Sequence, residues 1–134
     1  MTNFKAEKLN FSCGTPDVDT YLKDMQNFVA IMPEQVEDWY ADKQSCSFFI
    51  KNLGKLGMKK GDVIFPGQFE FPSSENSKVI FTLRFYFQLI NDVQGEGYFE
   101  LSADINPMVE MMARRPLTNF VNILTQNFQR VMNK

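Results

Sequence analysis

Few side chains in this sequence could carry out acid–base or nucleophilic chemistry. The chain contains no histidine, which excludes Ser-His and Cys-His nucleophilic systems, histidine metal ligands and histidine pH switches. Carboxylate chemistry remains possible, and Asp62 is the candidate. In a regular strand, Asp62 would lie on the same face as Met58 and Ile64, and its side chain could therefore point into the core. A bulge at Gly57 or Gly61 would turn Asp62 outward, and we expect this exposed position.

Two further groups of charged residues lie at residues 54–61 and at Arg84 and Asp104. Residues 54–61 are rich in glycine and lysine, but they lack the Gly-Lys-Ser/Thr of a phosphate-binding loop and no helix pattern follows them. We therefore expect a curved hairpin with solvated lysines. Arg84 and Asp104 fall on the same strand face, which predicts an exterior ion pair of small energetic value.

The two cysteines, Cys13 and Cys46, give no sign of a metal centre or a disulfide framework. They are too few for a framework and match no zinc spacing. We expect both to be buried reduced thiols. We also expect no bound metal and no cofactor.

Charge and hydropathy restrict the partners. The net charge of −2 comes from 14 basic and 16 acidic residues spread along the chain, without the basic stripe that nucleic acid backbones require. No apolar run approaches a signal peptide or the roughly 20 apolar residues of a membrane span. We therefore expect a cytoplasmic protein with no nucleic acid partner and no integral membrane association.

The strongest structural signal is a long helix at the end of the chain. Asn106-Pro107 marks its beginning, and apolar residues then recur on one face at about 100° per residue. This stripe consists of Leu117, Phe120, Val121, Leu124, Phe128 and Val131. Such a stripe needs a large apolar partner, and the preceding strands are the segments able to supply it.

The first turns of this helix carry three methionines away from the stripe. Continued backwards, the stripe passes through Ala113 and Val109, whereas Met108, Met111 and Met112 fall on nearly the opposite side. A kink at Pro116 would rotate these turns and bring the methionines inward. We expect instead a nearly straight helix and an exposed patch formed by Met108, Met111 and Met112.

The rest of the chain is predicted to be mainly β-structure. Apolar alternation and turn residues predict seven strands, at residues 3–11, 36–41, 45–51, 55–64, 68–72, 78–90 and 97–105. Thr15-Pro16 begins a helix over 16–26, with one or two further turns before Pro33. Residues 65–68 (Phe-Pro-Gly-Gln) predict a type II turn that closes a hairpin. No linker or repeat interrupts the sequence, which predicts one domain over residues 1–134.

Strand parity predicts which residues share the inner face of the sheet. In the last two strands, the apolar residues fall on one face of the sheet whenever the numbers of two directly paired residues add up to an even value. Those residues are Val79, Phe81, Leu83, Phe85, Phe87 and Leu89 with Phe99, Leu101, Ala103 and Ile105. Phe69 and Phe71 join them, and the same rule groups Cys46, Phe48 and Ile50 with Leu56 and Met58.

This element order resembles the START-like superfamily, also called SRPBCC or Bet v 1-like, of helix-grip fold. The resemblance also rests on Asn106-Pro107-Met108 at the start of the last helix and on Arg114-Arg115-Pro116-Leu117-xx-Phe120 within it. It looks closest to small bacterial members near the polyketide cyclases and dehydrases. It implies an α+β fold: a curved seven-stranded antiparallel sheet around the C-terminal helix, with two short helices between strands 1 and 2.

The resemblance also implies a cavity for lipids, sterol-like or polyketide-like molecules between the sheet and the helix. The residues expected to line it are Phe48, Met58, Phe69, Phe81, Leu83, Phe85, Leu101, Val109, Ala113, Leu117 and Phe120. A binding or carrier protein without catalysis is the first hypothesis.

Two alternatives stay open. One is an enzyme similar to aromatase/cyclases, in which Asp62 or Tyr86 would assist proton transfer inside the cavity. The other is a protein-interaction module without a ligand, with a filled core. Self-association through Met108, Met111 and Met112 is compatible with each hypothesis.

Overall fold

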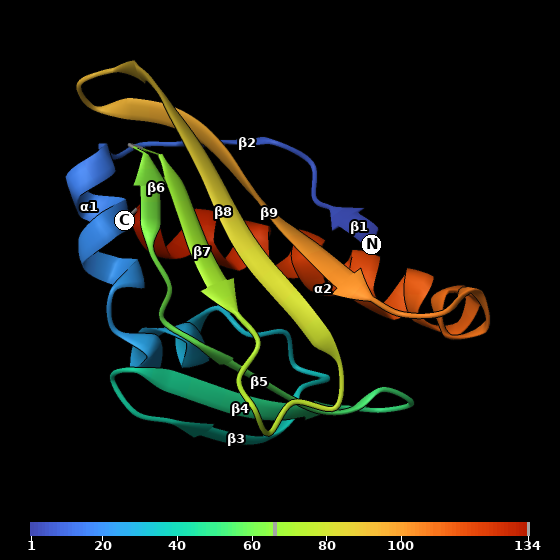
Figure 1. Cartoon of the computed structure of the whole chain (residues 1–134). Coiled ribbons are helices and arrows are strands. Elements are labelled where there is room, and N and C mark those ends of the chain that lie inside the picture. Colours follow the sequence, from blue (N-terminus) through green and yellow to red (C-terminus); the bar gives the residue numbers. More distant parts are fainter. Residues whose placement is uncertain (66, 134) are drawn as a thin grey trace.

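The computed structural model describes residues 1–65 and 67–133 and is an α+β fold (Figure 1). Strands β1 (Thr2–Lys5) and β2 (Leu9–Phe11) are followed by helix α1 (Thr15–Leu22) and the 3-10 helix η1 (Met25–Ala30). The central strands are β3 (Glu37–Ala41), β4 (Ser45–Ile50), β5 (Gly54–Lys59), β6 (Val63–Phe65) and β7 (Gln68–Pro72). The long hairpin of β8 (Ile80–Asn91) and β9 (Gln94–Asp104) leads into helix α2 (Pro107–Met132).

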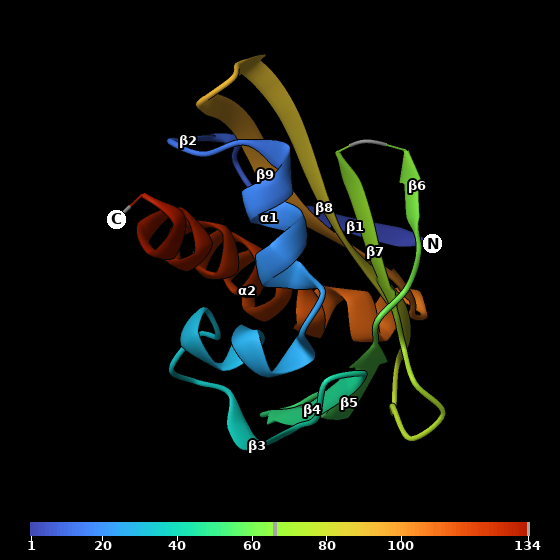
Figure 2. The same ribbon diagram turned by 90° about the vertical axis from the view of Figure 1, so that its left-hand side faces the viewer.

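The strands form two antiparallel sheets that meet at one end. The larger sheet has the order β1-β9-β8-β7-β6, with β2 also paired to β9, and the smaller sheet has the order β3-β4-β5. A bridge between Met58 and Ser73 joins them, as does a 2.8 Å hydrogen bond from the Ser74 amide to the Gly57 carbonyl. Figure 2 shows the larger sheet beside α2 and the smaller sheet below it. The expected antiparallel sheet with a long C-terminal helix is therefore confirmed.

Nine strands lie within the described residues, where the sequence predicted seven, because two predicted strands each divide. Strand 3–11 becomes β1 and β2, whose pairings with β9 differ by one residue in register. This shift lets Phe4 and Phe11, which have opposite parity, both face the core.

The second division separates β5 from β6 at residues 60–62. Here the chain leaves the smaller sheet and crosses to the larger one. The crossing requires Gly61, whose amide donates to the Glu70 carbonyl at 3.0 Å, because a Cβ at this position would collide with that carbonyl.

The short helical segment after β2 differs in detail from the prediction. Helix α1 ends at Leu22 instead of continuing to residue 26, and the next turns are 3-10 helix. Asp24 causes this break, since its carboxylate accepts from the Gln26 amide at 2.9 Å and so caps η1.

The parity predictions for the sheets are confirmed by the register. Leu83 pairs with Leu101 and Phe85 with Phe99 in the larger sheet, and Phe48 pairs with Leu56 in the smaller one. All of these side chains are buried. The predicted inner face is buried except at its ends, where Val79 and Ile105 are half-buried and Leu89 is exposed.

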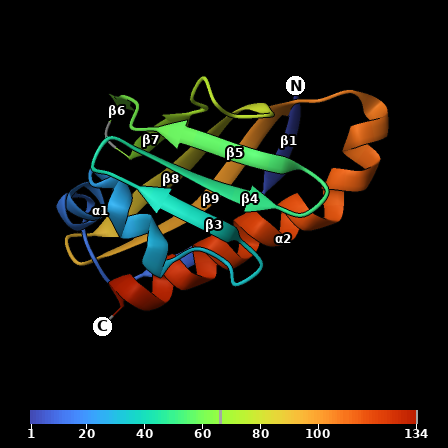
Figure 3. The same cartoon turned by 90° about the horizontal axis from the view of Figure 1, so that it is seen from below.

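Helix α2 places its stripe against β9, β1 and β2, and Figure 3 shows the helix running alongside the smaller sheet. Five stripe residues are buried and Val131 is half-buried. Thr125, also on the buried face, accepts a 3.0 Å hydrogen bond from the Phe99 amide and donates one of 2.8 Å to the Val121 carbonyl. This pair of bonds fixes the helix to the middle of β9.

The helix continues through Pro116 without interruption from Pro107 to Met132. Ala113 is buried, whereas Met108, Met111 and Met112 are all exposed. The expected exposed methionine patch is therefore confirmed. At the helix start, Asn106 accepts from the Val109 amide at 2.8 Å, which is an N-cap.

The hairpin of β6 and β7 closes as predicted. Gly67 has a φ of +95°, the left-handed conformation that the third position of a type II turn requires. Pro66, the second position of that predicted turn, lies outside the described residues.

Replacing Phe120 or Leu124 by alanine is expected to reduce the free energy of unfolding by about 2 to 5 kcal/mol, through lost burial and a residual void. Both side chains are buried, and the Phe120 ring stacks on Phe48 with 5.7 Å between centroids. Chemical denaturation monitored by circular dichroism measures this loss. Met111→Ala, at an exposed site of the same helix, is the control, and an equal effect in all three variants would contradict the described packing.

The buried cysteines should make the protein less stable at alkaline pH. Burial raises the pKa of the Cys46 thiol from 9.0 to about 12, and burial together with Asp17 raises that of Cys13 to about 11. The unfolded chain releases these protons at lower pH than the folded protein. The free energy of unfolding should therefore be unaffected below about pH 9 and fall as pH rises toward these values.

Denaturant unfolding at pH values on both sides of 9.0, the ordinary pKa of both thiols, measures this decline. Cys46→Ala should reduce the decline, because one of the two linked protons is removed. An unchanged decline in this variant would contradict the assignment.

Candidate functional site

The candidate site is an apolar pocket at the place where the two sheets separate. It lies between α1, the crossing at 60–62 and β7, and its volume is about 280 Å³. Its lining consists of Asp19, Leu22, Lys23, Lys60, Gly61, Asp62, Val63, Phe69, Glu70 and Phe71. The division of the predicted strand 55–64 creates this opening, because the crossing pulls β6 away from the smaller sheet.

The back of the pocket is formed by three buried apolar side chains. Phe69 and Phe71 alternate on β7 and both point inward. Leu22 closes the pocket from α1, where it is buried together with Val18. Val63, which pairs with Phe69, covers one side and is 51% exposed. An apolar group placed here would contact side chains from both sheet and helix.

The rim of the pocket is charged and mixed in sign. The Lys23 ammonium lies 3.9 Å from the Asp19 carboxylate, an exposed pair of small energetic value. Asp62 and Lys60 are also exposed. The backbone carbonyl of Asp62 accepts from the Glu70 amide at 3.2 Å, which holds the crossing against β7. The carboxylate of Asp62 is exposed, as expected, although the cause is the crossing and not a bulge within a strand.

The eleven residues predicted to line a cavity are buried, except Val109, which is half-buried. Phe69 lines the apolar pocket, and Phe48 borders a separate hollow on the outer side of the smaller sheet. Apart from Val109, the others pack within the core. Their role in ligand binding remains a prediction.

Aromatic rings occupy much of the space between the larger sheet and α2. The ring of Phe85 lies 4.7 Å from Phe99, 5.0 Å from Phe128 and 5.6 Å from Phe11, centroid to centroid. Phe28 of η1 adds an edge-to-face contact to Phe71 at 5.1 Å. Four hollows among the described residues have linings drawn from strands, α1 and loops, and none of these four linings includes a residue of α2.

The sequence analysis missed the contribution of α1 to the pocket. Asp19, Leu22 and Lys23 come from this helix. The spacing of Val18 and Leu22 indicated an apolar face. It carried no signal for the strand that this face would meet.

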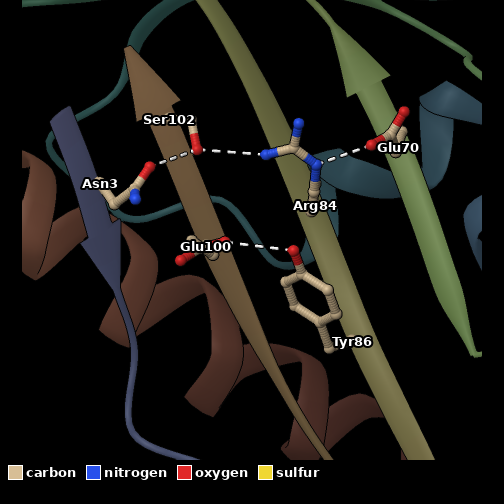
Figure 4. Close-up of polar contacts among 6 residues, drawn as sticks. All are labelled: Asn3, Glu70, Arg84, Tyr86, Glu100 and Ser102. Carbon is tan, nitrogen blue, oxygen red and sulfur yellow. Dashed lines mark hydrogen bonds and ion pairs between the residues drawn. The ribbon is translucent and has the colours of Figure 1, made fainter. Parts of the chain in front are cut away.

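The outer face of the larger sheet carries a polar network instead of the predicted pair of Arg84 and Asp104 (Figure 4). That prediction is wrong because the register places Ile80 opposite Asp104 and Glu100 opposite Arg84. The Arg84 guanidinium donates to Glu70 at 2.7 Å. This hydrogen bond raises the pKa of Arg84.

The same network extends across β9 to β1. Arg84 also donates to the Ser102 hydroxyl at 3.1 Å, and Ser102 donates to the Asn3 side chain at 2.6 Å. Tyr86 donates to Glu100 at 3.2 Å, and burial followed by the Glu100 charge raises the pKa of this phenol. Figure 4 shows these side chains on one face of the sheet. Tyr86 therefore lies outside the core and cannot assist proton transfer in an inner cavity.

The described residues include neither a cluster suited to a metal ion nor a helix suited to a membrane span. No group of three or more histidine, cysteine, aspartate or glutamate side chains is arranged there to hold a metal ion. In the same part of the chain, none of the helices has the length and apolar character needed to span a membrane.

Sequence comparison gives no relatives, whereas structure comparison gives many. No protein-family model matches the sequence, and no curated protein matches it either. Solved structures with a similar fold include a START superfamily protein from Mycobacterium smegmatis, with 9% identity and a TM-score of 0.65 over 98% of this chain and 95% of that one.

Two other similar structures broaden the comparison. The Aha1 dimer from Colwellia psychrerythraea has 10% identity and a TM-score of 0.63, covering 99% of this chain and 97% of that one. Norcoclaurine synthase from Thalictrum flavum, in complex with a transition state analogue, has 9% identity and a TM-score of 0.67, covering 98% and 93%. Identities this low establish the fold alone. The chain therefore has the START/SRPBCC-like fold, also called Bet v 1-like, which the sequence predicted.

Proposed function

We propose that the protein binds a small amphipathic molecule in the pocket between α1, β7 and the crossing at 60–62. The observation that carries this proposal is the wall of Leu22, Phe69 and Phe71, which lies at the back of a hollow open to solvent. Small-molecule sites are commonly hollows of about 300 to 1,000 Å³ with mostly apolar walls and a few polar groups. The volume of about 280 Å³ lies just below this range.

The size and the rim of the pocket indicate what kind of molecule fits. A short acyl chain or a compound of one or two rings suits this volume better than a whole sterol. Its apolar part would lie against Phe69 and Phe71, and its polar part would meet Lys60 and Asp62 at the rim. Both the acyl and the polyketide-like members of the ligand class expected from the sequence satisfy this description.

The structural neighbours support a binding role. Norcoclaurine synthase has this fold and was solved with a transition state analogue, so the fold can hold a small organic molecule in that protein. Asp62, the carboxylate considered for proton transfer, is exposed at the rim of the pocket and does not lie in its apolar interior. Tyr86, the other candidate for proton transfer, faces the opposite side of the sheet. We therefore favour binding over catalysis.

Filling the pocket should abolish binding of an apolar probe. Val63 is 51% exposed and lines the pocket, so Val63→Trp places an indole in its opening. A titration with the fluorophore Nile red should show binding to the wild type, displacement by decanoate, and affinity at least about tenfold lower in the variant.

Val29→Trp is the matched control, because Val29 is 56% exposed on η1 and belongs to none of the described hollows. It adds the same side-chain volume and should leave binding unchanged. Equal Nile red affinity in the wild type and both variants would contradict this site. Absence of any binding by the wild type would contradict the proposed function.

We also propose that the exposed methionine patch mediates self-association. Its residues, Met108, Met111 and Met112, are flexible apolar side chains on the first turns of α2, and such patches are common at protein contacts. The similar Aha1 protein is described as a dimer. A second copy of this chain is therefore the proposed occupant of the patch.

Replacing Met108 and Met111 together by glutamine should shift the protein toward monomer. Sedimentation velocity over a range of protein concentrations measures this shift. The free energy of unfolding at low concentration should change by less than about 0.5 kcal/mol, because both positions are exposed. A wild type that is monomeric at every concentration would exclude this assignment.

A further inference from the structure

A second hollow lies on the outer face of the smaller sheet and shares no lining residue with the apolar pocket. It consists of two depressions with volumes of about 410 and 490 Å³, and Tyr40, Ser47 and Asn76 line both of them. The two depressions therefore form one continuous trough, which we call the outer trough.

The strand register explains why the sheet is hollowed here. Tyr40 on β3 pairs with Ser47 on β4, and Ser47 pairs with Gly57 on β5. The floor at Ser47 is low because serine has a small side chain. Tyr40 forms one wall. The loop at 74–76 forms the other, since a Cβ on Gly57 would meet the Ser74 hydroxyl and the Asn76 side chain.

Several polar groups in the outer trough have hydrogen-bonding capacity that the protein does not use. Ser47 is only 9% exposed, and its hydroxyl forms no hydrogen bond with any other described residue. Among the described residues, however, no fully buried side-chain polar atom lacks a hydrogen-bond partner. The Ser47 hydroxyl is thus accessible from the trough. Asn76 accepts from the Ser74 hydroxyl at 2.5 Å through its oxygen, which leaves its amide hydrogens available.

The charged residues of the lining are balanced. Lys55 and Lys59 contribute ammonium groups, and Asp38 and Glu75 contribute carboxylates. None of these four side chains forms an ion pair with another described residue. The lining therefore offers both donors and acceptors with no net charge.

This combination selects the chemistry of the ligand. A hydroxyl group both donates and accepts, so a polyhydroxylated ligand can use every polar group of the lining. A phosphate ester only accepts and cannot pair with Asp38 and Glu75, whereas an ammonium only donates and cannot pair with the lysines.

The aromatic wall adds a second selection. Tyr40 is 63% exposed, and its ring face carries negative potential that attracts the weakly positive C–H groups of a sugar ring. A peptide strand is disfavoured at β3, because Asp38 has a φ of +53° and the register is irregular between Glu37 and Tyr40. We propose that the outer trough binds a neutral oligosaccharide, with one sugar ring on Tyr40 and hydroxyl groups at Ser47 and Asn76.

Titration of isotopically labelled protein with maltohexaose and with cellohexaose, followed by amide NMR, tests this proposal. At least one of these neutral glycans should shift the amide signals of Tyr40, Ser47, Gly57 and Asn76. Adenosine monophosphate, an aromatic anion, should leave these signals unchanged. Absence of shifts with both glycans, or shifts in the trough with the nucleotide alone, would overturn the proposal.

Variants then distinguish stacking from a general change of the fold. Tyr40→Ala should weaken glycan binding at least about tenfold, whereas Tyr40→Phe, which keeps the ring, should retain most of it. Ser47→Ala should also weaken binding and serves as a second test if Tyr40→Ala unfolds. Ile80→Ala is the control, because Ile80 is 64% exposed on a strand of the other sheet. Equal affinities in Tyr40→Ala, Ser47→Ala and the wild type would exclude the outer trough.

Discussion

The structure depends above all on the contact between the apolar stripe of α2 and the inner face of β8 and β9. The rings of Phe85, Phe99 and Phe128 meet at the centre of this contact, and Thr125 fixes its register through the Phe99 amide. Burial of aromatic surface on this scale is the largest favourable term available to a domain of this size. The curvature of the sheet and the direction of the helix both follow from it, since each side must cover the other.

This contact also explains which parts of the protein are closely packed and where a pocket lies. Aromatic side chains pack closely between the larger sheet and α2. The smaller sheet is separate from the larger one, and the chain crosses between them at residues 60–62. The apolar pocket lies at this division, with Leu22, Phe69 and Phe71 in its lining. The proposed ligand thus completes a packing surface that the crossing leaves open.

The two faces of the sheets serve different chemistry. On the inner side, phenylalanine rings and aliphatic groups leave an apolar pocket with a few charges at its rim. On the outer side of the larger sheet, Arg84 and its partners form hydrogen bonds to one another. The outer side of the smaller sheet differs, because Ser47 and the lysines and carboxylates around it have no partners among the described residues. Unused hydrogen-bonding capacity, not depth, distinguishes this trough.

The sequence by itself determined the fold class, the long helix with its stripe, the exposed methionines, and which strand residues face inward. These features follow from local periodicity, because side-chain direction in a helix or strand is fixed by residue spacing. Only the tertiary structure decided the partner of Arg84, the one-residue shift that buries both Phe4 and Phe11, and the crossing at Gly61. A pairing in which the two residue numbers add up to an even value allows Arg84 to lie opposite either Asp104 or Glu100. The pocket and the trough could not be predicted from the sequence either, because each is lined by residues from distant segments. Sequence periodicity contains no information on the distance between two packed elements.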